Sequence, residues 1–203
     1  IYHGQLKDLN LKFKTFINTI NPHSYVVSKK DKFFSNALLH SDYLLPDGVG
    51  FVLAAKVLYN VSIERLTGAK IHEFLLKKAN NESLRVFYLG SSKETLELIK
   101  FKNSSRFPKI KFSYFSPPFK STFNNKENTE MIQKVNSFKS DILFVGMTAP
   151  KQEKWSYLNK DKINANTIVT IGAVFDFYAG TIIRPKPFAQ KLGLEWALRL
   201  INE

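Results

Sequence analysis

Two hydrophobic patterns alternate along this chain. Short apolar runs rich in β-branched and aromatic residues indicate buried strands, and the stretches between them repeat apolar residues every three or four positions, as amphipathic helices do. Strands are expected at 14–20, 43–45, 85–89 and 109–115, with two more inside 141–176. Helical segments are expected within 24–39, at 49–58, around 71–79, at 93–102, 130–138 and 192–201, and after Pro150, with a polar surface loop at 120–128. This alternation predicts an α/β fold: a single domain over residues 1–203 with a mainly parallel sheet and helices on both faces.

The stretch 141–176 is the most informative part of this pattern. It reads as a strand, a loop that contains Gly146, a helix that begins at Pro150, a second strand and a turn that ends at Asp176. Two strands joined by a helix form a βαβ unit, and such folds keep their ligands in the loops that follow parallel strands. We therefore expect a site for a phosphorylated small molecule here.

Composition narrows the class of protein. With 203 residues, 44% of them hydrophobic, the chain suits one well-buried domain, and the lack of cysteine fits a reducing compartment such as the cytosol. No apolar run approaches the roughly 20 residues of a transmembrane helix. The formal net charge of +13 suits nucleic acid, an anionic membrane or a phosphorylated substrate. Because the lysines are spread out and no nucleic-acid motif occurs, a solvated surface or anionic lipid is favoured over nucleic acid.

Asp47 is the first candidate for chemistry. It follows an apolar strand and precedes Gly48, where a carboxylate often acts as a catalytic acid or base beside a ligand. The local sequence on its own favours a second interpretation, in which Asp47 is a turn residue that caps the helix at 49–58.

Two other segments are suited to binding anions. Arg65 precedes a helix that begins near Gly68, so it suits an anion at the helix N-terminus, or an ion pair with Glu64 or another carboxylate. The turn at 90–92, between a strand and a helix, is expected to point backbone N–H groups at a phosphate.

Motifs of several common enzyme classes are absent from the sequence. No HExxH, Asp-x-Asp or cysteine–histidine cluster offers ligands to a metal, and neither a Gly-x-Ser-x-Gly nor a Walker A segment occurs. The histidines are scattered and expected on the surface or in packing, with only His23 left open: His3, His23, His40 and His72. No cofactor or metal is therefore expected.

Five segments in a consistent order carry a resemblance to a known family. They are Thr-x-Asn at 19–21, PDGVG at 46–50, ERLTG at 64–68, DILFVGMTAPKQEKW at 141–155, and IGAVFDFYAG, RPKP and LGLEW between 171 and 196. Together they resemble the TagA/WecG/CpsF family of bacterial glycosyltransferases over most of residues 14–203. The resemblance implies a Rossmann-like transferase that moves a sugar from a UDP-sugar to a polyprenyl-diphosphate-linked sugar. It also implies inversion of the anomeric centre without a metal, with N-acetylmannosamine or its uronic acid as the sugar.

The resemblance also implies roles for residues of this chain. Asp47 matches the proposed catalytic base, Thr19 and Asn21 match residues of the same pocket, and Arg65 matches an arginine that holds the diphosphate or the acceptor phosphate. In the PKQE segment, Gln152 is expected to contact the nucleotide sugar directly. Further substrate-binding residues are expected at Gly90, Ser91, Gly146, Lys151, Gly172, Asp176 and Arg184, with sheet-end structure as the alternative for Asp176.

This chemistry is self-consistent. An inverting transfer needs one general base to take the proton of the acceptor hydroxyl while C1 is attacked from the face opposite UDP. Without a metal, the leaving diphosphate must be stabilised by Arg, Lys or backbone N–H groups. The candidates are Arg65, Lys151, Arg184 and the Gly90-Ser91 loop.

The setting follows from the same resemblance. The expected partners are a UDP-sugar, a polyprenyl-diphosphate-linked acceptor and an anionic membrane surface, and not nucleic acid; homo-oligomerisation is left open. The protein is expected in the cytoplasm, peripheral on the inner face of the bacterial plasma membrane, in the synthesis of teichoic acid, capsule or another surface polysaccharide.

Three questions stay open at the level of sequence. The PDG, SPPF and FDFYAG segments look closer to the capsule branch, so UDP-glucose or another UDP-hexose competes as donor. Relatives usually continue beyond the LEW helix into a basic appendage thought to bind the membrane. Because this sequence ends at Glu203, a truncated core with weak or no activity is expected. A non-catalytic UDP-sugar-binding module, which has no need of Asp47, is the rival from another class.

Overall fold

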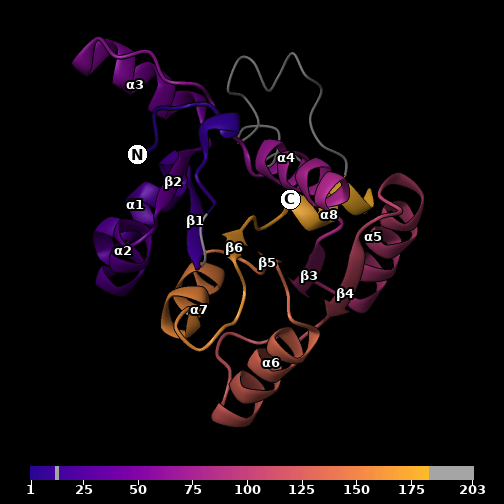
Figure 1. The fold of residues 1–203 in the computed structure, drawn as a ribbon. Helices are drawn as coiled ribbons and strands as arrows, with labels where there is room; N and C mark the ends of the chain where they lie inside the picture. Colours follow the sequence, from indigo (N-terminus) through magenta and orange to yellow (C-terminus); the bar gives the residue numbers. More distant parts are fainter. Residues whose placement is uncertain (12–13, 183–203) are drawn as a thin grey trace.

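Six parallel strands, in the order β2-β1-β6-β5-β3-β4, form the centre of the molecule (Figure 1). This computed structural model describes residues 1–11 and 14–182. The strands are β1 (Thr15–Ile20), β2 (Tyr43–Pro46), β3 (Arg85–Gly90), β4 (Lys111–Phe115), β5 (Ile142–Gly146) and β6 (Thr167–Thr170). Every neighbouring pair is parallel, which confirms the predicted sheet.

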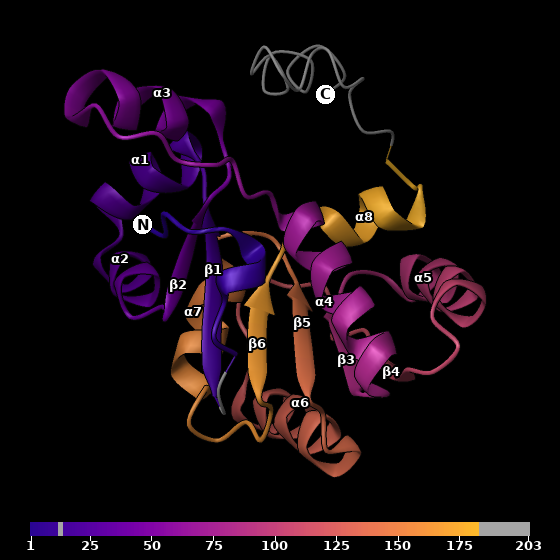
Figure 2. The same ribbon diagram turned by 45° about the horizontal axis from the view of Figure 1, so that its top comes forward.

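Helices cover both faces of the sheet because consecutive strand residues point to opposite sides (Figure 2). In β3, Val86 and Tyr88 pack with the core under α4 (Gly68–Glu82), α5 (Lys93–Arg106) and α8 (Val174–Ala179). Phe87 and Leu89 face the opposite core, under α6 (Asn125–Phe138) and α7 (Lys151–Asn159). The remaining helices are η1 (Leu6–Asp8), α1 (Pro22–Lys30), α2 (Lys32–Leu39) and α3 (Val49–Tyr59). The Rossmann-like α/β domain is therefore confirmed.

Two predicted segments are wrong in detail. Residues 120–128 were expected to be a loop, but α6 begins at Asn125. Asn124 Oδ1 accepts from the Glu127 N–H at 2.9 Å, and Glu127 Oε2 accepts from the Asn124 N–H at 2.8 Å, a capping box inside an Asn-rich run. Asp176 was expected to end a loop, but it belongs to the first helical turn of α8. This turn forms because Val174 and Phe175 are buried beside it. The helix predicted at 192–201 lies outside the described residues.

The topology brings the six carboxyl ends of the strands to one edge. The chain steps from β1 out to β2, crosses to β3 and β4 at the far side, and returns through β5 and β6 to the centre. Ligands of open parallel sheets bind outside the carboxyl ends of the strands, where the strand order changes direction. Across residues 1–11 and 14–182, no helix has both the length and the apolar character needed to cross a bilayer.

Candidate active site

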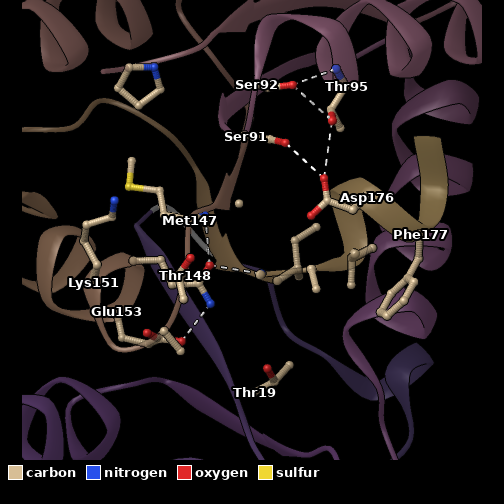
Figure 3. Close-up of a pocket in the computed structure, with 18 of the residues that line it drawn as sticks. Thr19, Ser91, Ser92, Thr95, Met147, Thr148, Lys151, Glu153, Asp176 and Phe177 are labelled. Carbon is tan, nitrogen blue, oxygen red and sulfur yellow. Dashed lines mark hydrogen bonds between the residues drawn. The ribbon is translucent and has the colours of Figure 1, made fainter. Parts of the chain in front are cut away.

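A cavity of about 780 Å³ lies along the carboxyl edge of the sheet. Its volume is in the range of small-molecule sites. Figure 3 shows Lys151 and Glu153 on one side, Asp176 and Ser91 on the opposite side, and Thr19 from β1. The predicted site residues that line it are Thr19, Asn21, Asp47, Ser91, Gly146, Lys151, Gln152, Gly172 and Asp176. Arg65 and Gly90 are not part of this lining, but each lies against a lining residue, Asp47 and Gly146 respectively, and Arg184 lies outside the described residues.

Asp47 stands where β2 ends and α4 begins. Its Oδ2 accepts from the Gly68 N–H at 3.2 Å, and its Oδ1 lies 3.7 Å from an Arg65 guanidinium nitrogen. It does not cap the helix at 49–58: the N-cap of α3 is Gly48, without a side-chain bond. The sequence left two roles open for Arg65, which were binding an anion and pairing with a carboxylate. Arg65 pairs with Asp47, and because this carboxylate lines the cavity, the pair also places Arg65 near a bound ligand. The Asp47 side chain is 28% exposed and the Arg65 side chain 21%, so both are partly accessible to solvent.

The Thr-x-Asn segment enters the cavity from β1. Thr19 pairs with Leu45 in the sheet, so it lies beside the end of β2, which Asp47 follows. Asn21 is exposed and extended (φ −120°), and its Oδ1 accepts from the Ser24 N–H at 2.9 Å. This cap begins α1 at Pro22, so one part of the Asn21 amide holds the loop and the Nδ2 group remains for a ligand.

Gln152 holds the opposite wall together. Its Oε1 accepts from the N–H of Met147 at 3.2 Å and of Gly172 at 3.0 Å, which joins the loops after β5 and β6. Its Nε2 donates to Glu153 Oε1 at 2.8 Å. Two converging N–H donors fix which end of the amide is oxygen. The side chain is 3% exposed, so at most one N–H of Gln152 is left for a ligand. The main contribution of Gln152 in this structure is to shape the wall.

Glu153 also lines the cavity, although the PKQE segment alone did not identify it as a site residue. It is 2% exposed, and Oε2 has no hydrogen-bond partner among the described residues. Burial raises its pKa to about 7, opposed in part by the bond from Gln152. A carboxyl that is neutral over much of the acidic range can donate a hydrogen bond as well as accept one.

The wall formed by β3 and α5 departs from the expectation for the turn at 90–92. The Ser91 N–H donates to Gly146 O at 2.9 Å, so it is not directed at a phosphate. Gly90 has φ +126°, and a Cβ there would lie 2.2 Å from that same carbonyl oxygen. A glycine is therefore needed at this position for the close approach of β3 to β5. The Ser92 side chain caps α5 by accepting from the Thr95 N–H. The first turn of α5 still faces the cavity, with Lys93 in its lining.

Asp176 faces this wall from α8. Its Oδ1 accepts from Ser91 Oγ at 3.2 Å and from Thr95 Oγ1 at 3.3 Å (Figure 3). The carboxylate thus links α8 to the start of α5 while it lines the cavity, and its contact with a ribose or sugar stays a prediction.

Lys151 closes the cavity at the start of α7. Its Nζ donates to Lys120 O at 2.8 Å and lies 5.2 Å from the centroid of the Phe123 ring. Burial lowers its pKa. A lysine that is partly desolvated in this way binds an incoming anion more strongly than a fully hydrated one.

The histidines divide as the sequence indicated. His72 is 2% exposed, its Nε2 lies 2.7 Å from the Tyr88 hydroxyl, and burial lowers its pKa to about 3. It is a neutral packing residue. His23, the one left open, lines the cavity. Within the described parts of the chain, no group of three or more His, Asp or Glu side chains is arranged to hold a metal ion.

Comparison with known proteins gives the family. Residues 5–203 match the model described as "Glycosyl transferase WecG/TagA/CpsF family". The chain belongs to this family. Similar proteins include the "N-acetylglucosaminyldiphosphoundecaprenol N-acetyl-beta-D-mannosaminyltransferase" of Bacillus subtilis (strain 168), 28% identical over 193 residues, which are 95% of this chain and 73% of that protein. The protein of the same name from Staphylococcus aureus (strain MW2) is 26% identical over 188 residues, 93% and 72% of the two chains.

As a member of the WecG/TagA/CpsF family, this protein is a glycosyltransferase, which removes the non-catalytic binding module from consideration. The segments at 19–21, 46–50, 141–155 and 171–180 all contribute residues to the lining of one cavity, and the ERLTG segment contacts the lining residue Asp47, whereas RPKP and LGLEW lie outside the described residues. The motifs did not show which of their residues face a ligand and which hold the loops of the cavity in place. The signal for Glu153 was present in PKQE, but its burial depends on the packing of α7 against the sheet, which no local pattern encodes.

Proposed function

We propose that this protein transfers an N-acetylmannosamine-type sugar from a UDP-sugar to a polyprenyl-diphosphate-linked N-acetylglucosamine, with inversion and without a metal. The relatives in Bacillus and Staphylococcus are named for such an acceptor and such a sugar. A lipid-linked acceptor is made at a membrane, so we propose that the protein works at the cytoplasmic face of the plasma membrane, as part of cell-wall or surface polysaccharide synthesis.

The position of Asp47 is the observation on which this proposal mainly rests. Its carboxylate lines a cavity of about 780 Å³ and is flanked by the N-terminus of α4 and by Arg65. In the proposed reaction, Asp47 takes the proton of the acceptor hydroxyl as that oxygen attacks C1 of the donor sugar. The bond between C1 and the UDP oxygen breaks on the opposite face, and its electron pair stays on the diphosphate.

The leaving diphosphate needs positive charge, and two helix N-termini can provide it. Helices α5 and α7 both begin at the cavity, with Lys93 and Lys151 in their first turns. Free N–H groups of a first helical turn attract anions, and Lys151 adds a partly desolvated ammonium. We propose that the diphosphate lies between these helix starts, with Arg65 on the acceptor side. Asp176 then faces the ribose or the sugar from α8.

A two-part experiment tests this function. Thermal unfolding is followed with UDP, UDP-N-acetylmannosamine, UDP-glucose and UDP-N-acetylglucosamine, and each donor is then tested for transfer to a synthetic lipid-diphosphate N-acetylglucosamine. We expect the largest stabilisation and the only rapid product formation with UDP-N-acetylmannosamine, and an unchanged rate in EDTA. Stabilisation by UDP without transfer from any donor contradicts the proposed reaction.

The donor panel also decides the second candidate. If UDP-glucose or another UDP-hexose gives the faster transfer, the fold and reaction type stand while the sugar changes to one of the capsule type. Rates that fall in EDTA and recover with Mg²⁺ contradict the metal-independent part of the proposal. Each outcome is read from product formed, so stabilisation by UDP alone does not decide between them.

A further inference from the structure

Helix α3 exposes an apolar surface that the fold leaves uncovered. It has the sequence VGFVLAAKVLY, and none of its eleven residues is buried. Its large apolar side chains are exposed to an unusual degree: Leu53 61%, Val57 72%, Leu58 69% and Tyr59 75%. In both ribbon views α3 projects away from the sheet, beyond the β2 edge (Figures 1 and 2). A helix that is apolar on nearly all sides is ordinarily buried, so this surface marks a contact with another body.

The neighbouring helix extends this surface and gives it a charge. The Phe51 ring of α3 meets the Tyr25 ring of α1 edge-to-face, with centroids 6.1 Å apart. Tyr25 and Val26 are 45% and 56% exposed, and we call the combined surface the α1–α3 patch: Tyr25, Val26, Leu53, Val57, Leu58 and Tyr59. Helices α1 and α3 carry Lys29, Lys30 and Lys56, and neither contains an Asp or Glu. The two helices that form the patch thus contribute apolar side chains and only basic charges.

We propose that the α1–α3 patch docks on the surface of an anionic bilayer and so presents the acceptor lipid to Asp47. The inference rests on the proposed function, because it takes the acceptor to be lipid-linked. Val49, the first residue of α3, lies two positions after Asp47, so a bilayer at α3 lies next to the cavity. The polyprenyl chain then stays in the membrane while the acceptor sugar enters the site.

The length and charge of the patch fit an anionic bilayer surface. Eleven residues of helix span about 16 Å, roughly half of the hydrocarbon core of a bilayer, so α3 lies in the interface and does not cross it. Leu, Val and Tyr side chains with lysines beside them are typical of interfacial helices, and each lysine near an anionic surface strengthens binding about fivefold. A second copy fits less well. A two-fold dimer through this patch would bring Lys29, Lys30 and Lys56 close to their own copies with no acidic partner in either helix.

Vesicle binding by matched variants tests the inference. The test variant carries Leu53→Gln, Val57→Gln and Leu58→Gln, which keep helix propensity and alter only exposed side chains. The control carries Leu98→Gln and Phe101→Gln on α5, side chains that are 44% and 77% exposed. In co-sedimentation with vesicles of phosphatidylglycerol and phosphatidylcholine, we expect the test variant to bind about tenfold or more weakly than the wild type, and the control to bind like the wild type. With phosphatidylcholine alone, the wild type should also bind more weakly.

A second readout separates this inference from the proposed function. With a short-chain, water-soluble acceptor the test variant should turn over like the wild type, whereas with the polyprenyl acceptor in vesicles its rate should fall by about the same factor as its binding. Equal vesicle binding by wild type and test variant overturns the inference, as does a dimer-to-monomer change in the variant with unchanged vesicle binding. Failure of the wild type on the short acceptor, with vesicle binding still dependent on α3, contradicts the proposed function alone.

Discussion

The two walls of the cavity hold their polar side chains in opposite ways. On the wall formed by β2 and α4, Asp47 and Arg65 are 28% and 21% exposed and form an ion pair 3.7 Å long. On the wall formed by β5, α7 and β6, Gln152 and Glu153 are 3% and 2% exposed, and Gln152 binds backbone N–H groups of two loops. A partly exposed ion pair contributes about 0–1 kcal/mol to stability, whereas a buried group that loses its partner costs about 1–3 kcal/mol. We therefore expect the first wall to contribute to the reaction more than to stability, and the second to maintain the shape of the site.

The largest effect should follow from removing the carboxylate of the reactive wall. Asp47→Asn keeps the size of the side chain and an oxygen for the Gly68 N–H, but it cannot accept a proton. We expect turnover to fall by about 10²–10⁴-fold, with UDP affinity and the unfolding midpoint close to those of the wild type. Single-turnover rates with saturating donor, together with calorimetric titration of UDP, measure both quantities.

The matched control for this change is Asp161→Asn, at an exposed aspartate after α7. It should leave turnover and UDP binding unchanged. If Asp47→Asn keeps turnover within tenfold of the wild type, Asp47 is not the base. If it unfolds the protein, the division between a reactive wall and a structural wall does not hold.

The structural wall should respond in the opposite manner. Gln152→Ala leaves the N–H groups of Met147 and Gly172 without their acceptor, at a cost of about 2–4 kcal/mol in the free energy of unfolding. We expect this loss in urea unfolding at neutral pH, together with weaker UDP binding, because the loops after β5 and β6 lose their common anchor.

Two further variants sharpen this result. Gln133→Ala, at an exposed position of α6, should change the free energy of unfolding by less than about 0.5 kcal/mol. Gln152→Glu restores an acceptor for the two N–H groups but places a second carboxyl against Glu153, so it should recover only part of the stability. A Gln152→Ala protein as stable as the wild type, with only donor binding lost, would return Gln152 to the direct contact that the sequence predicted.

The difference between the walls also marks the limit of sequence reasoning. The strands were predictable because apolar and aromatic runs such as 85–89 are local signals, and Asp47 was predictable because it follows such a run and precedes a glycine. The anchoring by Gln152 was not, since its oxygen meets N–H groups five and twenty residues away, brought together only by the sheet. Glu153 was missed for the same reason.

Two other elements show the same limit. The helix at 49–58 was predicted correctly, but only the fold shows that α3 is left uncovered. The Gly90-Ser91 turn was read as a phosphate site, yet the Gly146 carbonyl, from a strand far along the chain, takes the Ser91 N–H. Local sequence predicts elements and end positions well. It does not predict which backbone N–H and C=O groups will form hydrogen bonds with neighbouring strands.

A smaller effect concerns the pH dependence of the structural wall. Burial raises the pKa of Glu153 from the 4.5 of an unperturbed carboxyl to about 7, so between these values the folded state binds a proton that the unfolded chain does not. Stability therefore falls as pH rises from about 4.5 to about 7, by at most about 3 kcal/mol, and is unaffected by this group below that window. Glu153→Gln should remove this slope, as measured by urea unfolding across the window.

The control must account for His72, which acts in the opposite direction. Its folded pKa of about 3 lies below the unfolded value of 6.5, so it costs stability as pH falls through that range. The difference between wild type and Glu153→Gln isolates the carboxyl, because His72 is the same in both. Glu130→Gln, at an exposed position of α6, serves as the matched change. A wild-type curve parallel to that of Glu153→Gln contradicts the assignment.

The smallest effect should come from Arg65→Lys on the reactive wall. Lysine keeps the charge beside Asp47 but loses the planar fork that can hold two phosphate oxygens. We expect kcat/KM for the acceptor to fall about tenfold, with UDP affinity unchanged, if Arg65 holds the acceptor phosphate. If Arg65 acts only by orienting Asp47, its effect should vanish in the Asp47→Asn background, which a double-mutant cycle on kcat/KM measures. A tenfold loss in both backgrounds assigns Arg65 to the substrate, and a loss in the wild-type background alone assigns it to the carboxylate.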